Sequence, residues 1–458
     1  MKSNGVIPSL LVLAAGVVVG GLLAGAPLAL LAFGVFGLVV VAARKPFWLL
    51  SLVVLSELLL PGLGRLYSVT IANVTMNGSV LIDALILGFA ILLLVHTRRP
   101  VIYRESWPLL GLALAATVST LIAKDPLLAL KGVLKLYSFL VVYSLARSVG
   151  SKSDGWTRTL RLVAAVSAAV FTLGFIEYAL GYNIISGAQI SSVVFSSDFQ
   201  AIGEFSRIRS TFTHPNQYGL AASIIALICV GEWRTQRSRL FGIVAIAAFF
   251  SVILSFSRIA WIGAACGGAL MLFFALRGRR LLVTALAAVT AVPVAWWMGS
   301  LLIQRATLDS SALLRLRIID AELQLFKSSP IFGVGYDGFY AQSPSLFGFP
   351  LEAHGDYLRL LAETGVVGLL FFAAWLLFPV FSLTRRGLLE RDEDLSARSF
   401  ALAACFLSAA IFALTDNATQ GLGLLVLFWG LYDGWRSADH LRRPSQRNGA
   451  NVNVGQAS

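Results

Sequence analysis

Long apolar runs separated by short polar segments extend along the chain from residue 8 to residue 435. A helix that crosses the hydrocarbon core of a membrane needs about 20 apolar residues. Most of the runs approach this length, and the run at 46–60 is short enough to be re-entrant. The pattern predicts an all-α polytopic bundle of about 12–14 transmembrane spans. The spans are drawn from runs near residues 8–25, 27–43, 46–60, 80–95, 107–123, 126–146, 158–181, 215–232, 238–256, 259–276, 281–303, 358–383, 398–414 and 419–435.

The composition is that of a membrane protein. Hydrophobic residues make up 57% and charged residues 13% of the 458 positions, whereas soluble domains average roughly 45–50% and 25%. No Ser-, Pro- or Gly-rich linker divides the runs, so we expect a single transmembrane domain over residues 1–435. The polar tail over residues 436–458 is expected to be disordered. The start of the chain is similar to a signal peptide, but a second apolar run follows at once, which favours an uncleaved first helix.

The net charge of +13 follows from the topology of the chain. Lys and Arg accumulate in every second loop between the runs, as they do in the cytoplasmic loops of membrane proteins. This register predicts that both termini are cytoplasmic and that two long segments, residues 182–214 and 304–357, lie on the outer side. The sequence has neither a basic domain nor a basic face interleaved with aromatic residues, so it does not predict binding to nucleic acid.

Cysteine positions and missing motifs exclude several classes of protein. Cys229, Cys266 and Cys405 all lie inside apolar runs without paired spacing, so we expect packing residues and neither a disulfide nor a metal cluster. The chain has no His-Glu-x-x-His, Walker or Gly-x-Ser-x-Gly motif. This argues against a zinc protease, an ATPase and a serine hydrolase.

The two outer segments hold the candidate histidines. Residues 313–326 form an amphipathic stretch, with apolar residues three or four apart, that predicts a helix lying at the membrane surface. Of the four histidines, only His214 and His354 lie where the outer segments re-enter the membrane. A lone histidine is most often a hydrogen-bonded structural residue, so the residues around it decide its role.

Arginines accompany these histidines on the outer side. They are Arg207 and Arg209 before the sequence THPN, Arg258 between two apolar runs, and Arg315 and Arg317 in the amphipathic stretch. A charge inside the membrane costs about 2.5–3.5 kcal/mol or more and normally faces a cavity or a partner, which singles out Arg258. Guanidinium groups match phosphate oxygens in a bidentate way. Because the outer side holds no ATP, convergent arginines predict a lipid-borne phosphate such as a polyprenyl diphosphate.

Two features leave alternatives open. The glycines of GVGYDG fit either a loop that cradles phosphate or a tight turn after the preceding proline. Lys131 and Lys135 lie one helical turn apart within an apolar run. They fit either the lining of a cavity or ion pairs with Glu177 or Asp83.

Three outer segments together carry a family pattern. They are RIRSTFTHPNQYGL from Arg207, SFSRIAWIG from Ser255, and SSPIFGVGYDGF from Ser328, which runs on to HGDYLRLLAETGVVG from His354. In this order and on this side of the membrane, they resemble the O-antigen ligase and polysaccharide polymerase superfamily of bacterial membrane glycosyltransferases. The resemblance covers roughly residues 200–380 in motifs and the whole chain in architecture.

The resemblance implies an enzyme that moves a glycan from undecaprenyl diphosphate to an acceptor hydroxyl at the periplasmic face of the bacterial inner membrane. Such enzymes serve lipopolysaccharide or exopolysaccharide synthesis. The implied partners are the lipid-linked glycan, an acceptor glycan that is either lipid A core or growing polysaccharide, and the bilayer. Ligase, polymerase and protein glycosylase remain alternatives that the motifs do not separate.

The resemblance also assigns residues to the site. His354 is implied as the catalytic base, with Gly355 in place of the amide or hydroxyl residue that usually follows it. Arg258 is implied as catalytic and, together with Arg207 and Arg315, as a ligand of the diphosphate. The pattern is completed by Gly365 and Gly368 in the expected spacing and by Ile319 in place of an aromatic residue.

Secondary candidates and a competing function complete the predictions. The secondary site candidates are His214, Arg209, Arg317 and Asp356. No outer Asp-x-Asp pair is present, so we expect a metal-independent reaction without a cofactor. The competing function is a transporter or flippase of lipid-linked sugars. Against it, the two halves show no obvious repeat and the candidate residues gather at one membrane face.

Overall fold

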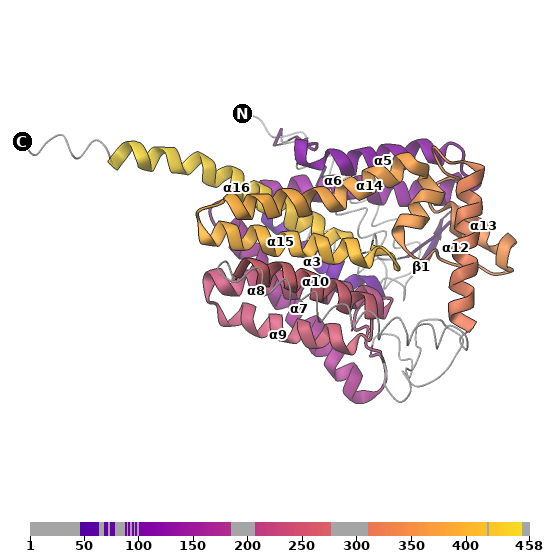
Figure 1. Ribbon diagram of the computed structural model, residues 1–458, viewed down its shortest axis with the longest axis horizontal. Helices are drawn as coiled ribbons and strands as arrows, with labels where there is room; N and C mark the ends of the chain where they lie inside the picture. Colours follow the sequence, from indigo (N-terminus) through magenta and orange to yellow (C-terminus); the bar gives the residue numbers. More distant parts are fainter. Residues whose placement is uncertain are drawn as a thin grey trace, which may run out of the picture.

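The computed structural model describes most of the chain. The described residues are 46–63, 68–71, 74–77, scattered positions between 88 and 98, and residues 100–184, 207–275, 310–418 and 421–450. Within these residues the protein is a bundle of long helices that run side by side (Figure 1). The predicted all-α polytopic fold is confirmed.

Five of the described helices are long and apolar enough to cross a membrane: Pro126–Gly150, Gly155–Leu180, Arg258–Ala275, Asp356–Leu389 and Glu393–Phe412. Shorter apolar helices cover Pro46–Leu59 and Arg239–Leu254. The predicted runs at 8–25, 27–43 and 281–303, and most of the run at 80–95, lie outside the described residues. The total of about 12–14 spans therefore stays a prediction.

Most of the described helices overlap the predicted apolar runs or the predicted amphipathic stretch. Their bounds are α3 (Pro46–Leu63), η1 (Arg104–Ser106), α5 (Trp107–Thr120), α6 (Pro126–Gly150), α7 (Gly155–Leu180), α8 (Pro215–Gln236), α9 (Arg239–Leu254), α10 (Arg258–Ala275), α12 (Ser310–Ser328), α13 (Gly338–Phe347), α14 (Asp356–Leu389), α15 (Glu393–Phe412) and α16 (Leu422–Ala450). Of these helices, η1 and α13 lie outside both the runs and the stretch.

Local capping decides where the helices begin and end. α6 begins at Pro126, and the carboxylate of Asp125 accepts a hydrogen bond from the backbone N–H of Leu128 at 3.1 Å. Proline suits the first helical position because its missing N–H would have no partner inside the helix. α7 is followed by Gly181 at φ +71°, a left-handed conformation that glycine adopts without strain.

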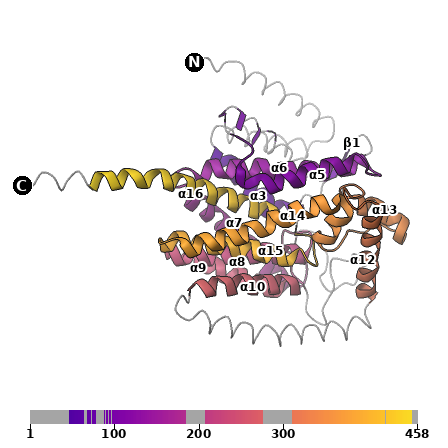
Figure 2. The ribbon, with the colours of Figure 1, turned by 45° about the horizontal axis from the view of Figure 1, so that its top comes forward.

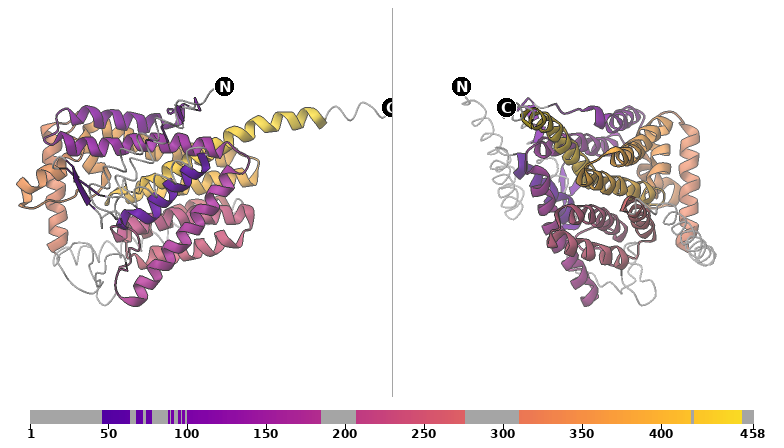
Figure 3. Two further views of the ribbon diagram at one scale, coloured as in Figure 1. Left: turned by 180° about the vertical axis from the view of Figure 1, so that it is seen from behind. Right: turned by 60° about the vertical axis from the view of Figure 1, so that its left-hand side comes forward.

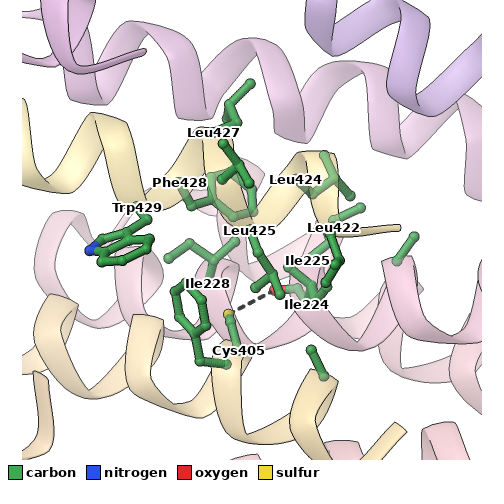
Figure 4. Packing of buried hydrophobic residues seen from close by; sticks show 14 of the residues in the cluster. Ile224, Ile225, Ile228, Cys405, Leu422, Leu424, Leu425, Leu427, Phe428 and Trp429 are labelled. Atoms are coloured by element: carbon green, nitrogen blue, oxygen red, sulfur yellow. Dashed lines mark hydrogen bonds between the residues drawn. The ribbon is translucent and has the colours of Figure 1, made fainter. Parts of the chain in front are cut away.

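The core includes the region where α8, α15 and α16 meet (Figure 4). Cys405 of α15 is fully buried, and its thiol donates to the backbone carbonyl of Ile224 in α8 at 3.4 Å. Leu425 of α16 is buried in the same cluster. All three cysteines are free thiols, and Cys229 and Cys405 are buried. The predicted packing role is confirmed for these two.

A small β-hairpin was not predicted. β1 (Ser68–Ile71) pairs antiparallel with β2 (Val74–Asn77). Its sequences, SVTI and VTMN, are rich in β-branched residues that favour strands. Each strand has only four residues and lies between two apolar runs, so the search for membrane spans did not predict the hairpin.

α16 continues to Ala450, past residue 436 where the disordered tail was expected to begin. Extending a helix that already exists costs much less free energy than starting a new one. The C-terminal part of α16 projects away from the bundle (Figures 1 and 3). Residues 451–458 lie outside the described residues.

The two ends of the bundle carry different structures. α12 and α13 stand at one end, where α12 runs roughly across the direction of the long helices (Figure 2). The turn between α14 and α15 and the projecting part of α16 lie at the opposite end (Figure 1). We call the end with α12 and α13 the outer-loop end and the opposite one the tail end.

Candidate functional site

Arg207 is anchored at the turn between α9 and α10. Its Nε donates a hydrogen bond to the backbone carbonyl of Ser255 at 3.1 Å. Its Nη2 donates to the side-chain oxygen of Asn216 at the start of α8. Because Ser255 lies three residues before Arg258, these contacts hold the first predicted motif against the second.

Glu177, near the end of α7, fixes the turn that follows Arg207. Its side chain is buried, and its carboxylate accepts hydrogen bonds from the backbone N–H groups of Ser210 at 2.7 Å and Arg209 at 3.4 Å. Ser210 has φ +51°, a conformation that non-glycine residues keep only where their surroundings enforce it. The carboxylate is thus engaged with this turn rather than with Lys131 or Lys135.

Three guanidinium groups share the region around Arg207. Burial lowers the pKa of Arg207 to about 10, the positive charges of Arg315 and Arg258 act in the same direction, and Asp416 opposes them. Arg207 stays protonated at neutral pH. Like charges repel more strongly near a protein than in bulk water. Three cations and one carboxylate therefore make a region suited to an anionic ligand.

His354 lies two residues before α14 in the same region. Its side chain is half-buried. Burial lowers the pKa of His354 below its ordinary value, the charge of Arg315 lowers it further, and Asp416 and Glu352 oppose the shift. The imidazole is therefore neutral at neutral pH, which is the form that can accept a proton.

The structure explains why a glycine follows His354. Gly355 has φ +90°, and a Cβ atom at this position would lie 2.9 Å from the carbonyl oxygen of Leu414. A side chain does not fit here without movement. An amide reaches the histidine segment from another element instead, because Nδ2 of Asn417 donates to the carbonyl of Ala353 at 2.9 Å.

Asp416 is a site residue that the sequence analysis missed. It lies in the turn between α15 and α16, and it accepts a hydrogen bond from Nδ2 of Asn216. Since Asn216 also binds Arg207, a continuous chain of contacts joins Arg207 to Asp416. The available signal was an acidic residue in a short turn between the last two apolar runs. The outer-side candidates were chosen mainly among arginines and histidines, so this residue was not selected.

Two of the secondary candidates have local roles. His214 precedes α8 as its N-cap, and its Nδ1 accepts a hydrogen bond from the backbone N–H of Asn216 at 3.2 Å. Arg209 donates through Nη1 to the backbone carbonyl of Thr213 at 3.2 Å. Both contacts shape the entry of the chain into α8, which carries Asn216 to the site.

The other two secondary candidates lie on α12 and α14. Arg317 is exposed on α12. Asp356 is completely buried at the start of α14, and its Oδ1 lies 2.8 Å from Nη2 of Arg359. Asp356 therefore belongs to a separate ion-pair cluster rather than to the group around Arg207.

The segment GVGYDG forms a turn against α14. The backbone N–H of Val334 donates to the carbonyl of Ala362 at 3.0 Å, and that of Gly335 donates to the carbonyl of Glu363 at 3.0 Å. These two donors are used inside the protein and do not point to a phosphate. The tight-turn interpretation fits these bonds. In the described part of the chain, no group of three or more His, Cys, Asp or Glu side chains could hold a metal ion.

Comparison with known proteins identifies the segment that contains most of this site. A family model described as O-Antigen ligase matches residues 243–373, a range that includes Arg258, Arg315 and His354. No curated protein matches the chain significantly. The match confirms the superfamily that the three motifs predicted. The protein is a multi-pass membrane protein that carries an O-antigen ligase domain over residues 243–373.

Proposed function

We propose that the protein is a glycosyltransferase that moves a glycan from a polyprenyl diphosphate to an acceptor hydroxyl at the periplasmic face of the bacterial inner membrane. The observation that carries the proposal is the grouping of Arg207, Arg258 and Arg315 with His354 and Asp416. The O-antigen ligase domain supports the reaction class.

The arginines would bind the diphosphate of the donor. Arg258 begins α10 and Arg315 lies on α12, and both side chains are exposed to a ligand. Arg207 approaches from a third segment and is positioned by Ser255 and Asn216. Planar guanidinium groups from three directions can bind several oxygens of one diphosphate.

The reaction is a displacement at the anomeric carbon of the donor glycan. The acceptor oxygen forms a bond to this carbon, and the bond from the carbon to the diphosphate oxygen breaks, so that its electron pair leaves with the diphosphate. His354 takes the hydroxyl proton on an imidazole nitrogen. Asp416 favours the imidazolium that results, and the arginines stabilise the charge that builds on the leaving diphosphate.

No divalent metal or cofactor is required by this scheme, because the guanidinium groups supply the positive charge. The acceptor hydroxyl belongs to a glycan, either lipid A core or a growing polysaccharide. In this orientation the outer-loop end faces the periplasm, and both termini are cytoplasmic.

The test is transfer by the purified protein in liposomes that contain a polyprenyl-diphosphate-linked glycan and each acceptor in turn. We expect a glycan–acceptor product at the same rate with and without EDTA. A rate that EDTA abolishes and magnesium or manganese restores would contradict the arginine mechanism. Movement of the donor between leaflets without any product would instead identify a transporter.

A further inference from the structure

Arg359, one turn into α14, is surrounded by carboxylates. Its Nη2 lies 2.8 Å from Asp356, and its Nη1 lies 3.6 Å from Asp337 and 3.7 Å from Glu363. The guanidinium carbon lies 5.5 Å from the ring centre of Tyr336. Arg359, Asp356 and Glu363 are buried. We call these five residues the Arg359 cluster. Loss of its one cation would leave buried negative charges without compensation.

The Arg359 cluster joins the segment between α12 and α13 to α14. Asp337 is the N-cap residue of α13. Burial raises the pKa of Asp337, and Arg359, Lys131 and Lys135 oppose the shift. The positive charges of these two lysines of α6 therefore act on the same carboxylate as Arg359. Asp337 thus connects α13 to a cation of α14 in a region where α6 is close by.

A kink in α14 lets the segment pack closely. Gly365 has φ +68° inside α14, and a Cβ atom there would lie 2.1 Å from the carbonyl oxygen of Ile331. The backbone N–H of Val366 donates to the carbonyl of Pro330 at 3.0 Å. Backbone bonds and the Arg359 cluster therefore hold the same two segments together.

α12 packs against α14 and carries a buried carboxyl group whose pKa responds to the charges of the same cluster. Glu322 is 1% exposed, and neither of its carboxylate oxygens has a hydrogen-bond partner among the described residues. Burial and the charge of Glu363 raise the pKa of Glu322 to about 8, and Arg359 opposes them. α12 therefore brings a carboxyl group to the Arg359 cluster.

The same face of α12 leads to the site. Ile318 is completely buried in a cluster with Phe339 of α13 and Ala353. Arg315 lies three residues before Ile318 on α12, and His354 directly follows Ala353. This apolar cluster thus links the helix that carries Arg315 to the segment that carries His354.

We propose that Arg359 is a positioning residue that holds α12 and α13 on α14 and thereby fixes Arg315 relative to His354. The roles of Arg315 and His354 rest on the proposed function, but the geometric claim can be measured without transfer. A displacement of reacting groups by about 1 Å can lower the reaction rate about 100-fold. A loosened outer loop would therefore reduce turnover even in a protein that is fully inserted.

Three variants and one control test the proposal. Arg359→Gln removes the cation, and Arg359→Lys keeps the charge and should partly restore the wild-type behaviour. Asp337→Asn keeps Arg359 and removes the charge that pairs it with the N-cap of α13, and asparagine accepts the φ of +55° at this position. The Asp337→Asn variant keeps the proposal testable if Arg359→Gln does not fold. Lys327→Gln, at an exposed position near the end of α12, is the control.

The direct readout is a distance between spin labels on α12 and α14. Leu316→Cys and Leu370→Cys provide the sites, because these side chains are 61% and 64% exposed, and Cys266 is replaced by serine. We expect a narrow distance distribution in the wild type and the control, and a broader one in Arg359→Gln and Asp337→Asn. Unchanged distributions in both variants would overturn the proposal, whether or not the protein proves to be a transferase.

The kinetic readout separates positioning from folding. Per inserted molecule, kcat should fall about 100-fold in Arg359→Gln and less in Asp337→Asn. The KM for the donor should change less than kcat, because Arg207 and Arg258 lie outside the Arg359 cluster. Wild-type kcat in a variant with a broadened distance distribution would also overturn the proposal.

Discussion

Two arginines at the tail end, Arg147 and Arg398, are paired with carboxylates. Arg398 donates to both carboxylate oxygens of Glu232, at 2.8 Å and 3.3 Å. Arg147 pairs with Glu105 at 3.3 Å and with Asp433. Each guanidinium also lies over an aromatic ring. Such pairs compensate the charge within the protein and tie neighbouring helices together.

At the outer-loop end, the arginines of the candidate site are held differently. Arg207 donates to a carbonyl and to an amide oxygen, and the charges that act on it are Arg258, Arg315 and Asp416. Positive charge is gathered there in excess. Under the proposed function, an arginine's partners, rather than its place in the membrane, distinguish a structural cation from one that binds an anionic ligand.

Among the changes that compare the two ends, the largest expected effect comes from the geometry of Arg258. Arg258→Lys keeps the charge but loses the planar fork of donors, so we expect turnover to fall about 100- to 1,000-fold, as when a single transition-state contact is lost. Transfer per inserted molecule in liposomes measures this, with Arg161→Lys, at an exposed position on α7, as the control. Near-normal turnover of Arg258→Lys would make Arg258 a general cavity charge.

At the tail end, the same type of change should affect stability instead. Arg398→Gln leaves the buried carboxylate of Glu232 without its cation, which we expect to cost about 3–5 kcal/mol of unfolding free energy. Turnover per folded molecule should be unchanged. Denaturant unfolding in detergent, combined with the transfer assay, checks both parts. A loss of turnover without a loss of stability would remove the distinction between the two ends.

The pH dependence should report the charges around His354. Because burial and Arg315 lower the pKa of His354, turnover should fall on the acidic side with a midpoint below about 6.5, the ordinary value for histidine. Arg315→Gln removes a cation and should move this midpoint to higher pH. Asp416→Asn removes an opposing charge and should move it to lower pH. Midpoints that stay fixed in both variants would show that another group controls the acidic limb.

The smallest expected effect concerns Glu322. Its pKa is raised to about 8 in the folded protein, above the value of about 4.3 for an unfolded chain. The folded state therefore binds more protons between these values, and the stability from this group decreases as pH rises through the interval. Glu322→Gln should raise Tm at pH 8 more than at pH 5. Equal shifts at both pH values, as expected for the exposed control Asp320→Asn, would contradict this assignment.

Much of the fold follows from the sequence because apolar length and local caps act within one segment. The run at 126–146 begins where Asp125 and Pro126 start α6, and the run at 158–181 stops where Gly181 turns left-handed. The stretch at 313–326 falls within α12. Its exposed residues include the apolar Leu316, whereas the face that packs on α13 carries Ile318.

The contacts between segments were less accessible from the sequence. Arg207, Arg258, Arg315 and His354 were selected one by one, and only the folded chain places their charges in one region. Asp416 was missed because its role depends on a bond to a side chain 200 positions away. Asp356 shows how a neighbouring side chain can engage a candidate. It was selected for its place beside His354, and in the structure its carboxylate pairs with Arg359 of its own helix.

The central claim is that the arginines hold the donor while His354 carries the proton transfer. Binding of the lipid-linked donor and formation of the glycan–acceptor product should therefore be measured together in His354→Ala. The account predicts wild-type donor binding and a loss of roughly 100- to 10,000-fold in turnover, the usual size of a general-base contribution. His214→Ala, which removes the cap of α8, should lose much less. Transfer at the wild-type rate by His354→Ala would contradict the account.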